Sequence, residues 1–136
     1  MTETTHPPVD ALIIGGGPAG LTAALTLARQ CHTAVVFDSG TYRNASANHI
    51  HTVITWDHKS PADFRAAARE NIASGYETVI FRDVGVEVLR KADDGCFEAT
   101  DTDGELWMGK KVILATGVRD VYPDIEGYAE CWVKGM

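Results

Sequence analysis

A glycine pattern near the amino terminus restricts the fold more than any other feature of this 136-residue chain. The stretch LIIGGGPAG places Gly15, Gly17 and Gly20 in the order G-x-G-x-x-G. An apolar run rich in β-branched residues, Val9 to Ile14, comes before it, and a segment with apolar residues at helical spacing, Pro18 to Gln30, comes after it. This succession predicts a buried strand, a tight turn and a helix, as in a βαβ unit that binds a dinucleotide.

Each glycine of the pattern has a physical role. Gly15 permits the tight turn, Gly17 lets a pyrophosphate approach the backbone, and Gly20 lets the helix pack close to the strand. The start of the helix adds unpaired N–H groups and a partial positive charge. Asp38 follows the next predicted strand, Thr33 to Phe37, and lies 21 residues after Gly17, where a carboxylate accepts hydrogen bonds from a ribose. The alternative is a glycine-rich turn in a purely structural βαβ unit.

The rest of the chain predicts a mixed α/β domain. A second helix is expected over Pro61 to Ser74, with Ser60 as its N-cap. Short strands follow, and Asp94-Gly95 and Asp103-Gly104 are tight-turn dipeptides that join three of them. These strands are expected at Thr78 to Arg82, Gly85 to Arg90, Cys96 to Thr100, Glu105 to Met108 and Lys111 to Ala115. The predicted fold is a Rossmann-like parallel βαβ core, with the first, second and last strands as neighbours, extended by an antiparallel three-stranded meander.

Composition excludes several classes of function. The net charge of -7 argues against nucleic acid or an anionic membrane as the main partner. No apolar run approaches the roughly 18 residues of a membrane-spanning helix, and the first residues lack the pattern of a secretory signal. Three cysteines, Cys31, Cys96 and Cys131, are too few and too scattered for a disulfide framework, which favours a reducing, cytoplasmic location.

A metal site is not expected from the pattern of histidines. His49 and His51 share one face of an extended segment, and His58 follows in the same loop region. These histidines have no partner at a recognisable metal-ligand spacing, and the chain has no Cys-x-x-Cys pair. The sequence therefore gives no metal ligand.

Several stretches resemble the thioredoxin reductase family. A glycine fingerprint, an antiparallel meander and a strand ending in Ala115-Thr116-Gly117 occur in this order in the FAD domain of the two-dinucleotide disulfide oxidoreductases. The stretches DSGTYRNA, HIHTV and WDHKSPADFRAAARENI are similar to the fungal gliotoxin-type dithiol oxidases, which close disulfide bridges in epipolythiodioxopiperazines and related natural products. The resemblance runs from about Val9 to Met136 and implies FAD as the cofactor. An acid at position 38 also disfavours the 2′-phosphate of NADP.

The resemblance implies how the chain would hold FAD. The glycine loop would surround the pyrophosphate, and the segment that begins at Asp38 would hold the adenosine. His51 would lie near the cofactor, and Val84 would lie where the backbone meets adenine. The expected cofactor-binding residues are Gly15, Gly16, Gly17, Pro18, Ala19, Gly20, Asp38, Ser39, Gly40, Thr41, Tyr42, Arg43, His51, Val84, Ala115, Thr116 and Gly117.

The resemblance also implies that the chain is only part of an enzyme. In the family, the segment similar to GYAECWVKGM leads into a Cys-x-x-Cys redox pair, a nicotinamide-type domain and a closing FAD segment. We therefore expect a flexible terminus over residues 1–8, a partial FAD-binding domain over residues 9–136 and no catalytic residue in this chain, because Cys131 has no partner two residues on. The whole enzyme would oxidise a small-molecule dithiol, and a homodimer is left open.

Two other functions stay open at this point. The chain could be a stand-alone nucleotide- or FAD-binding module, or a truncated paralogue with a structural or partner role. One departure from the family pattern concerns stability: Cys31 stands where the family often has Gly to close the first helix. Since Gly relieves a left-handed helix cap, strain is expected at this turn.

Overall fold

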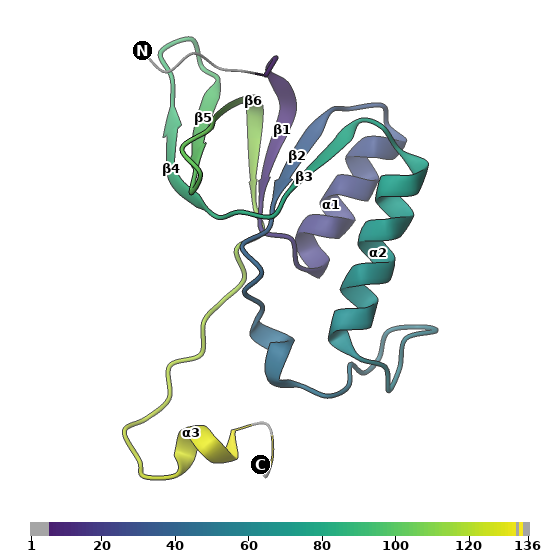
Figure 1. Cartoon of the computed structure of the whole chain (residues 1–136), viewed down its shortest axis with the longest axis vertical. Coiled ribbons are helices and arrows are strands. Elements are labelled where there is room, and N and C mark those ends of the chain that lie inside the picture. Colours follow the sequence, from purple (N-terminus) through teal and green to yellow (C-terminus); the bar gives the residue numbers. More distant parts are fainter. Residues whose placement is uncertain (1–5, 133, 135–136) are drawn as a thin grey trace.

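A single mixed sheet forms the centre of the computed structural model, which describes residues 6–132 and residue 134 (Figure 1). Its strands are β1 (Val9–Ile14), β2 (Ala34–Phe37), β3 (Val79–Arg82), β4 (Val86–Lys91), β5 (Phe97–Asp101) and β6 (Leu106–Leu114). They lie in the order β3-β2-β1-β6-β5-β4. The first four of this order are parallel, and β6, β5 and β4 pair antiparallel. The predicted neighbours of the first strand are thus confirmed.

Two helices cover one face of the parallel half of the sheet (Figure 1). They are α1 (Pro18–Arg29) and α2 (Pro61–Gly75), and Pro stands at the start of both, as predicted. The buried residues shared by the helices and this face are Ala11, Ile13, Leu21, Ala24, Ala28, Ala34, Val36, Ile72 and Val79. A 3-10 turn, η1 (Arg43–Ser46), and a short helix, α3 (Tyr128–Cys131), complete the chain. No helix of the described chain combines the length and apolar character needed to cross a membrane.

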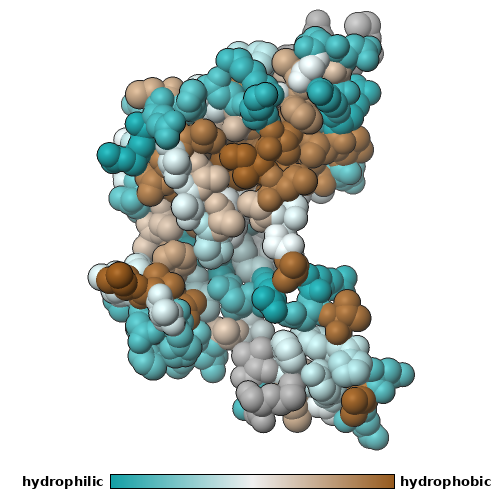
Figure 2. Space-filling view, turned by 180° about the vertical axis from the view of Figure 1, so that it is seen from behind, coloured by the Kyte–Doolittle hydropathy of each residue, from teal (hydrophilic) through white to brown (hydrophobic). Residues whose placement is uncertain are grey.

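The opposite face of the sheet packs against side chains of the meander. Its buried residues are Val9, Leu12, Val35, Phe37, Ala99 and Trp107. Because side chains alternate along a strand, β1 and β2 bury residues on both faces and read as continuous apolar runs. Figure 2, which shows the molecule from behind, has apolar side chains gathered on its upper part. Large apolar side chains exposed on the strands include Ile80, Val88 and Leu114.

Strand β6 corrects one expectation. The sequence predicted two strands, Glu105 to Met108 and Lys111 to Ala115, but the structure has one continuous strand of nine residues. Gly109 lies at its centre, opposite a β1 residue on one side and a β5 residue on the other. A Cβ atom on Gly109 would lie 2.6 Å from Cγ of Leu12. The glycine therefore permits close packing between strands and does not end a strand.

The described chain begins at His6, which is already in contact with the core. Its ring stacks on Trp107, with the centroids 4.0 Å apart and the planes 6° apart. Residues 1–5, which make up most of the predicted flexible terminus at residues 1–8, lie outside the described residues.

The carboxylate of Asp101 is fully buried where the meander meets β3. It accepts hydrogen bonds from the indole of Trp107, Arg82 and the backbone N–H groups of Asp103 and Glu105, at 3.0–3.2 Å. Burial by itself would raise the pKa of this carboxyl group, but the hydrogen bonds, led by that from Glu105, outweigh it and lower the pKa. The folded protein therefore holds Asp101 as a carboxylate.

Replacing this carboxylate should destabilise the fold. We expect Asp101→Asn to lower the free energy of unfolding by about 3 kcal/mol at pH 7, because it removes the buried charge that Arg82 and three N–H donors share and puts an amide NH2 in the place of one acceptor oxygen. The folded pKa is lowered, so the contribution of Asp101 is present above the unfolded pKa of about 3.9 and is lost as the pH falls toward the folded value. Urea unfolding at pH 7 and pH 3 measures both effects, with Asp103→Asn as an exposed control. Equal stability of Asp101→Asn and the wild type at pH 7 would contradict this role.

The end of α1 has the left-handed cap that the sequence predicted. Cys31 has a φ of 61°. Its N–H donates to the carbonyl of Ala28, and the N–H of His32 donates to the carbonyl of Leu27, both at 3.0 Å. This pair of bonds defines the Schellman motif, in which Gly is preferred at the left-handed position. A side chain at that position costs about 1–2 kcal/mol.

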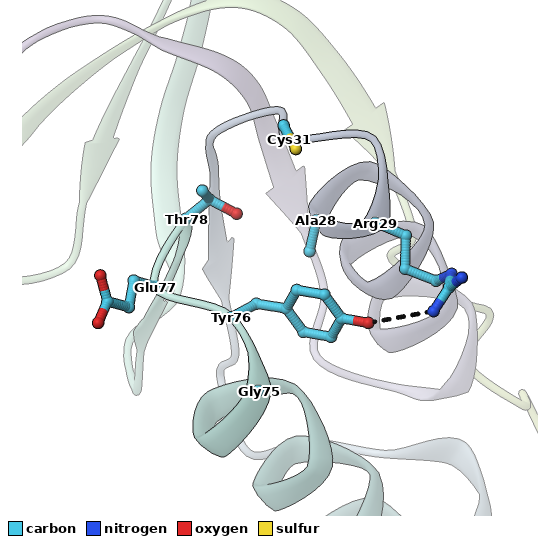
Figure 3. A pocket seen from close by; sticks show the side chains of 7 residues that line it. All are labelled: Ala28, Arg29, Cys31, Gly75, Tyr76, Glu77 and Thr78. Atoms are coloured by element: carbon cyan, nitrogen blue, oxygen red, sulfur yellow. Dashed lines mark hydrogen bonds between the residues drawn. The ribbon is translucent and has the colours of Figure 1, made fainter.

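Cys31 also borders a small pocket where the C-terminal ends of α1 and α2 meet (Figure 3). The pocket has a volume of about 360 Å³. Arg29 closes one side of it by donating a hydrogen bond to the hydroxyl of Tyr76 at 3.4 Å. Since α1 ends here and β2 begins a few residues later, the pocket lies at the amino-terminal edge of the parallel strands. Open α/β sheets bind their ligands at the opposite edge.

Relieving the left-handed cap should stabilise the protein. We expect Cys31→Gly to raise the free energy of unfolding by about 0.5–1 kcal/mol, since the strain relieved exceeds the added entropy of the unfolded chain. Thermal and urea unfolding measure this gain. Cys31→Ser is the matched control, because it removes the thiol and keeps the strain. A Gly variant that is no more stable than the Ser variant would show that the cap is not strained.

Candidate dinucleotide-binding site

A groove of about 1620 Å³ runs along the carboxyl ends of three parallel strands. Gly15 follows β1, Asp38 follows β2, and Ala115 follows β6, so three loops meet at one edge of the sheet. The first strand has β2 on one side and β6 on the other, so this edge is a topological switch point. Open α/β sheets bind nucleotides in the crevice at such a point.

The start of α1 faces this groove with its N–H groups uncapped. Its N-cap is Gly17, which offers no side chain, and its first turn contains no acid. The start of α2 is different, because Ser60 Oγ accepts hydrogen bonds from Ala62 and Asp63 at 3.2 and 3.3 Å, and Asp63 adds a negative charge. Of these two long helices, α1 therefore keeps the free donors and the positive pole that a phosphate requires, and α2 does not.

The backbone of the glycine loop is open to a ligand on one side and closely packed on the other. A Cβ atom on Gly17 would meet no protein atom within 4 Å. A Cβ atom on Gly15 would lie 2.2 Å from the carbonyl oxygen of Ala115, and one on Gly20 would lie 1.8 Å from that of Gly15. Gly15 also has a φ of 118°. Gly15 thus forms a tight turn and Gly20 permits a close helix–strand contact, while the space beside Gly17 is open.

The carboxylate of Asp38 is held against the glycine loop. Its Oδ1 accepts a hydrogen bond from the N–H of Gly40 at 2.9 Å, and its Oδ2 accepts one from the hydroxyl of Tyr42 at 2.6 Å. A Cβ atom on Gly16 would lie only 2.2 Å from Oδ2. Because each carboxylate oxygen accepts about two hydrogen bonds, Asp38 keeps acceptor capacity for a ribose diol.

Tyr42 is itself positioned by α2. The guanidinium of Arg65 lies over its ring, 3.7 Å from the centroid, and also donates to Oδ1 of Asn44 at 2.8 Å. Burial, followed by the hydrogen bond to Asp38, raises the pKa of the Tyr42 hydroxyl. Tyr42 therefore stays protonated and serves as the donor to Asp38.

An ion pair connects two loops that border the groove. Arg43, in η1, forms a two-pronged interaction with Asp120, with Nε–Oδ2 and Nη2–Oδ1 distances of 3.1 and 3.0 Å. The hydrogen bond to Asp120 raises the pKa of the Arg43 guanidinium. A guanidinium that is already paired with a carboxylate is a poor partner for a 2′-phosphate. This pairing therefore also disfavours NADP as the bound dinucleotide.

All but four of the predicted cofactor-binding residues line the groove. Gly20 packs beneath the glycine loop, and Gly40 forms an exposed turn with a φ of 74°. Val84 packs against the core near the meander, and His51 lies in another loop beside Asp57. The structure thus does not bring His51 and Val84 to the groove itself.

One border of the groove was not predicted from the sequence. Residues 44–47, residues 118–122 and Trp132 also line it. The segment after β6 runs away from the sheet as an extended trace toward α3 (Figure 1). It contains no motif, and its pairing with η1 joins positions far apart in the chain, so no local signal reveals it.

Comparison with known proteins supports the class of this site. The pyridine nucleotide-disulphide oxidoreductase family model matches residues 9–136. Thioredoxin reductase aclD of Aspergillus oryzae is 54% identical over 131 residues, which cover 96% of this chain and 41% of the relative. Thioredoxin reductase tcpT of Claviceps purpurea is 54% identical over 129 residues, with 94% and 40% covered. The structure of an oxidoreductase from Agrobacterium tumefaciens is similar with a TM-score of 0.88 at 35% identity, over 94% of this chain and 43% of that one.

This chain belongs to the pyridine nucleotide-disulphide oxidoreductase family. Within that family it is a flavin-binding domain of the thioredoxin-reductase type, with a Rossmann-like fold. It spans about two-fifths of the length of the curated relatives that it matches.

Proposed function

We propose that this chain is the FAD-anchoring part of a thioredoxin-reductase-like dithiol oxidase. The observation that carries the cofactor assignment is the uncapped start of α1 at Gly17, open to the groove and close to the carboxylate of Asp38. A dinucleotide needs a site for its pyrophosphate and an acceptor for its ribose, and the two lie side by side here. The residues present therefore fit FAD.

The chain's own residues would bind and orient the cofactor. The backbone from Gly15 to Ala19 would hold the pyrophosphate, and Asp38, fixed by Tyr42, would accept from the ribose. The loop from Ser39 to Arg43 would enclose the adenosine side, and Ala115 to Gly117 would approach from β6. The proximity of His51 and Val84 to the cofactor stays a prediction from the family resemblance. When bound, FAD would supply electron-transfer chemistry that no side chain of this chain provides.

The choice of an oxidase over a reductase rests on local resemblance. Three stretches, Asp38 to Ala45, His49 to Val53 and Trp56 to Ile72, are similar to the gliotoxin-type oxidases. The first of them forms part of the groove through Tyr42 and Arg43, and the third contains Arg65, which contacts the ring of Tyr42. The substrate would be a small-molecule dithiol of fungal secondary metabolism, and the location would be cytoplasmic.

The redox pair of this enzyme would lie beyond the chain described here. The apolar side chains of Val118, Val121 and Ile125 are 61–91% exposed along the segment after β6. Exposed apolar side chains on a segment that borders a ligand groove are typical of a surface that further protein covers. Together with the span of two-fifths of the relatives, this supports a partial FAD domain.

A stand-alone FAD-binding module is the second candidate. The observation that favours it is a closed core: both helices pack on four parallel strands, and the residues between them are buried. A truncated paralogue with a partner role would share this core. The coding sequence after Met136 distinguishes the dithiol oxidase from these two alternatives. An in-frame Cys-x-x-Cys there supports the enzyme, and its absence supports a stand-alone module or a truncated paralogue.

Filling the open space at Gly17 should abolish FAD binding without unfolding the protein. A valine side chain at Gly17 meets no protein atom but occupies the space of the pyrophosphate. Asp38→Ala should weaken binding by about 1.5–3 kcal/mol, the scale of a hydrogen bond to a charged group. Flavin absorbance after gel filtration measures retention, and circular dichroism checks the fold. Gly75→Val is the matched control, because Gly75 also has open space and lies far from the groove. Undiminished FAD binding by Gly17→Val would refute the assignment.

The 136-residue chain should show no dithiol oxidase activity of its own. A disulfide requires Cα atoms within about 7 Å. The three cysteines are free, and they lie apart in the fold: Cys31 after α1 at the edge opposite the groove, Cys96 in the turn between β4 and β5, and Cys131 in α3. Peroxide formation from dithiothreitol, FAD and oxygen measures the activity. Turnover above that of free FAD, lost in Cys131→Ser, would contradict the prediction, whereas activity restored by a longer chain would support the proposed function.

A further inference from the structure

Helix α2 is connected to the Asp38 end of the groove through one side chain, Arg65. Its guanidinium lies over the ring of Tyr42, 3.7 Å from the centroid, and its Nη1 donates to Oδ1 of Asn44 at 2.8 Å. Tyr42 in turn donates to Oδ2 of Asp38 at 2.6 Å. A continuous series of contacts therefore runs from the helix to the carboxylate.

Both oxygens of the Asp38 carboxylate are held by this chain. Oδ1 accepts from the N–H of Gly40 at 2.9 Å, and Oδ2 accepts from the hydroxyl of Tyr42. The terminal torsion of an aspartate is soft, so a carboxylate held at one oxygen can turn, whereas one held at both oxygens keeps its plane. Each oxygen still has room for one further donor. The direction in which Asp38 accepts from a ligand therefore depends on the Tyr42 hydroxyl.

The segment that carries Tyr42 has little apolar packing to hold it in place. Residues 39–41, which come before Tyr42, are exposed, and the four residues of η1, which follow it, are all at least partly exposed. Polar and aromatic contacts must therefore position the segment. Arg65 supplies two of them, because it contacts both the Tyr42 ring and Asn44.

Arginine is well suited to these two contacts. Its planar guanidinium can stack on an aromatic ring and donate hydrogen bonds in its own plane at the same time. The helix that carries Arg65 is fixed to the sheet, because Ile72 of α2 is part of the buried core. Arg65 therefore connects a loosely packed segment to the rigid part of the fold.

We propose that Arg65 is a positioning residue that makes the groove selective for the 2′-hydroxyl of an adenosine ribose. Through Tyr42 it holds the Asp38 carboxylate in the orientation that accepts from this hydroxyl. The inference rests on the proposed dinucleotide function, in which an acid at this place in the fold binds the ribose. Tyr42 lines the groove, whereas Arg65 lies outside its lining, so the effect of Arg65 reaches the ligand through Tyr42.

Calorimetric titration of the chain with ADP and with 2′-deoxy-ADP tests this role, because the two nucleotides differ only in that hydroxyl. We expect the wild type to bind ADP at least about tenfold more tightly, the scale of one hydrogen bond to a carboxylate. Arg65→Ala and Tyr42→Phe should each lose most of this preference, and the double variant should lose no more, since both changes break the same series of contacts. Arg65→Lys should retain part of it, because lysine keeps the charge without the planar donors.

Arg69→Ala is the matched control, and circular dichroism verifies that each variant is folded. Arg69 lies one turn further along α2, with its guanidinium 4.7 Å from the centroid of Phe81 and a hydrogen bond to Asp83, so its loss should leave the preference for ADP unchanged. An unchanged preference in Arg65→Ala would overturn the inference. An equal loss of affinity for both nucleotides, or additive losses in the double variant, would also overturn it.

Failure of the proposed function would look different. A wild type that binds neither ADP nor FAD would refute the dinucleotide site and the inference together. A wild type that binds ADP and 2′-deoxy-ADP equally well would refute the role of Asp38 at the ribose, and with it the role of Arg65.

Discussion

The contact of three backbone segments at Gly15 is the constraint on which the rest of this structure depends. The end of β1, the start of α1 and the end of β6 approach so closely that side chains at Gly15 or Gly20 would overlap carbonyl oxygens. This contact aligns the helix with the carboxyl edge of the sheet and gives the groove its floor. Larger residues would move the helix away and separate the positive pole of α1 from Asp38.

Two charged groups beside that floor are held by neighbours from this chain. Asp38 has Tyr42 and a backbone N–H, and Arg43 has Asp120. The start of α2 is satisfied by Ser60, but the start of α1 is not satisfied by any side chain. The groove thus combines side chains held in place by hydrogen bonds and an ion pair with the uncapped N–H groups at the start of α1. This arrangement is expected of a preorganised anion site.

Features with local signals could be predicted from the sequence, and features made by distant residues could not. The βαβ unit, the N-cap at Ser60 and the strained end of α1 depend on residues within a few positions of one another. The continuous strand β6 was missed because Gly109 has the appearance of a strand end, and its reason is the side chain of Leu12 on another strand. The pair of Arg43 and Asp120 joins positions 77 residues apart, with no motif at either end.

The position of β6 sets the order in which the chain can fold during synthesis. Val9 pairs with Gly109, and the strand between β2 and β6 is the first one made. As the ribosome releases the chain, β1 can pair with β2 early, but its other edge stays unpaired until β6 has emerged. Such non-local pairing makes folding slow, and an open strand edge invites contacts with other chains. The nascent domain therefore has its greatest need of protection by chaperones while the meander is being translated.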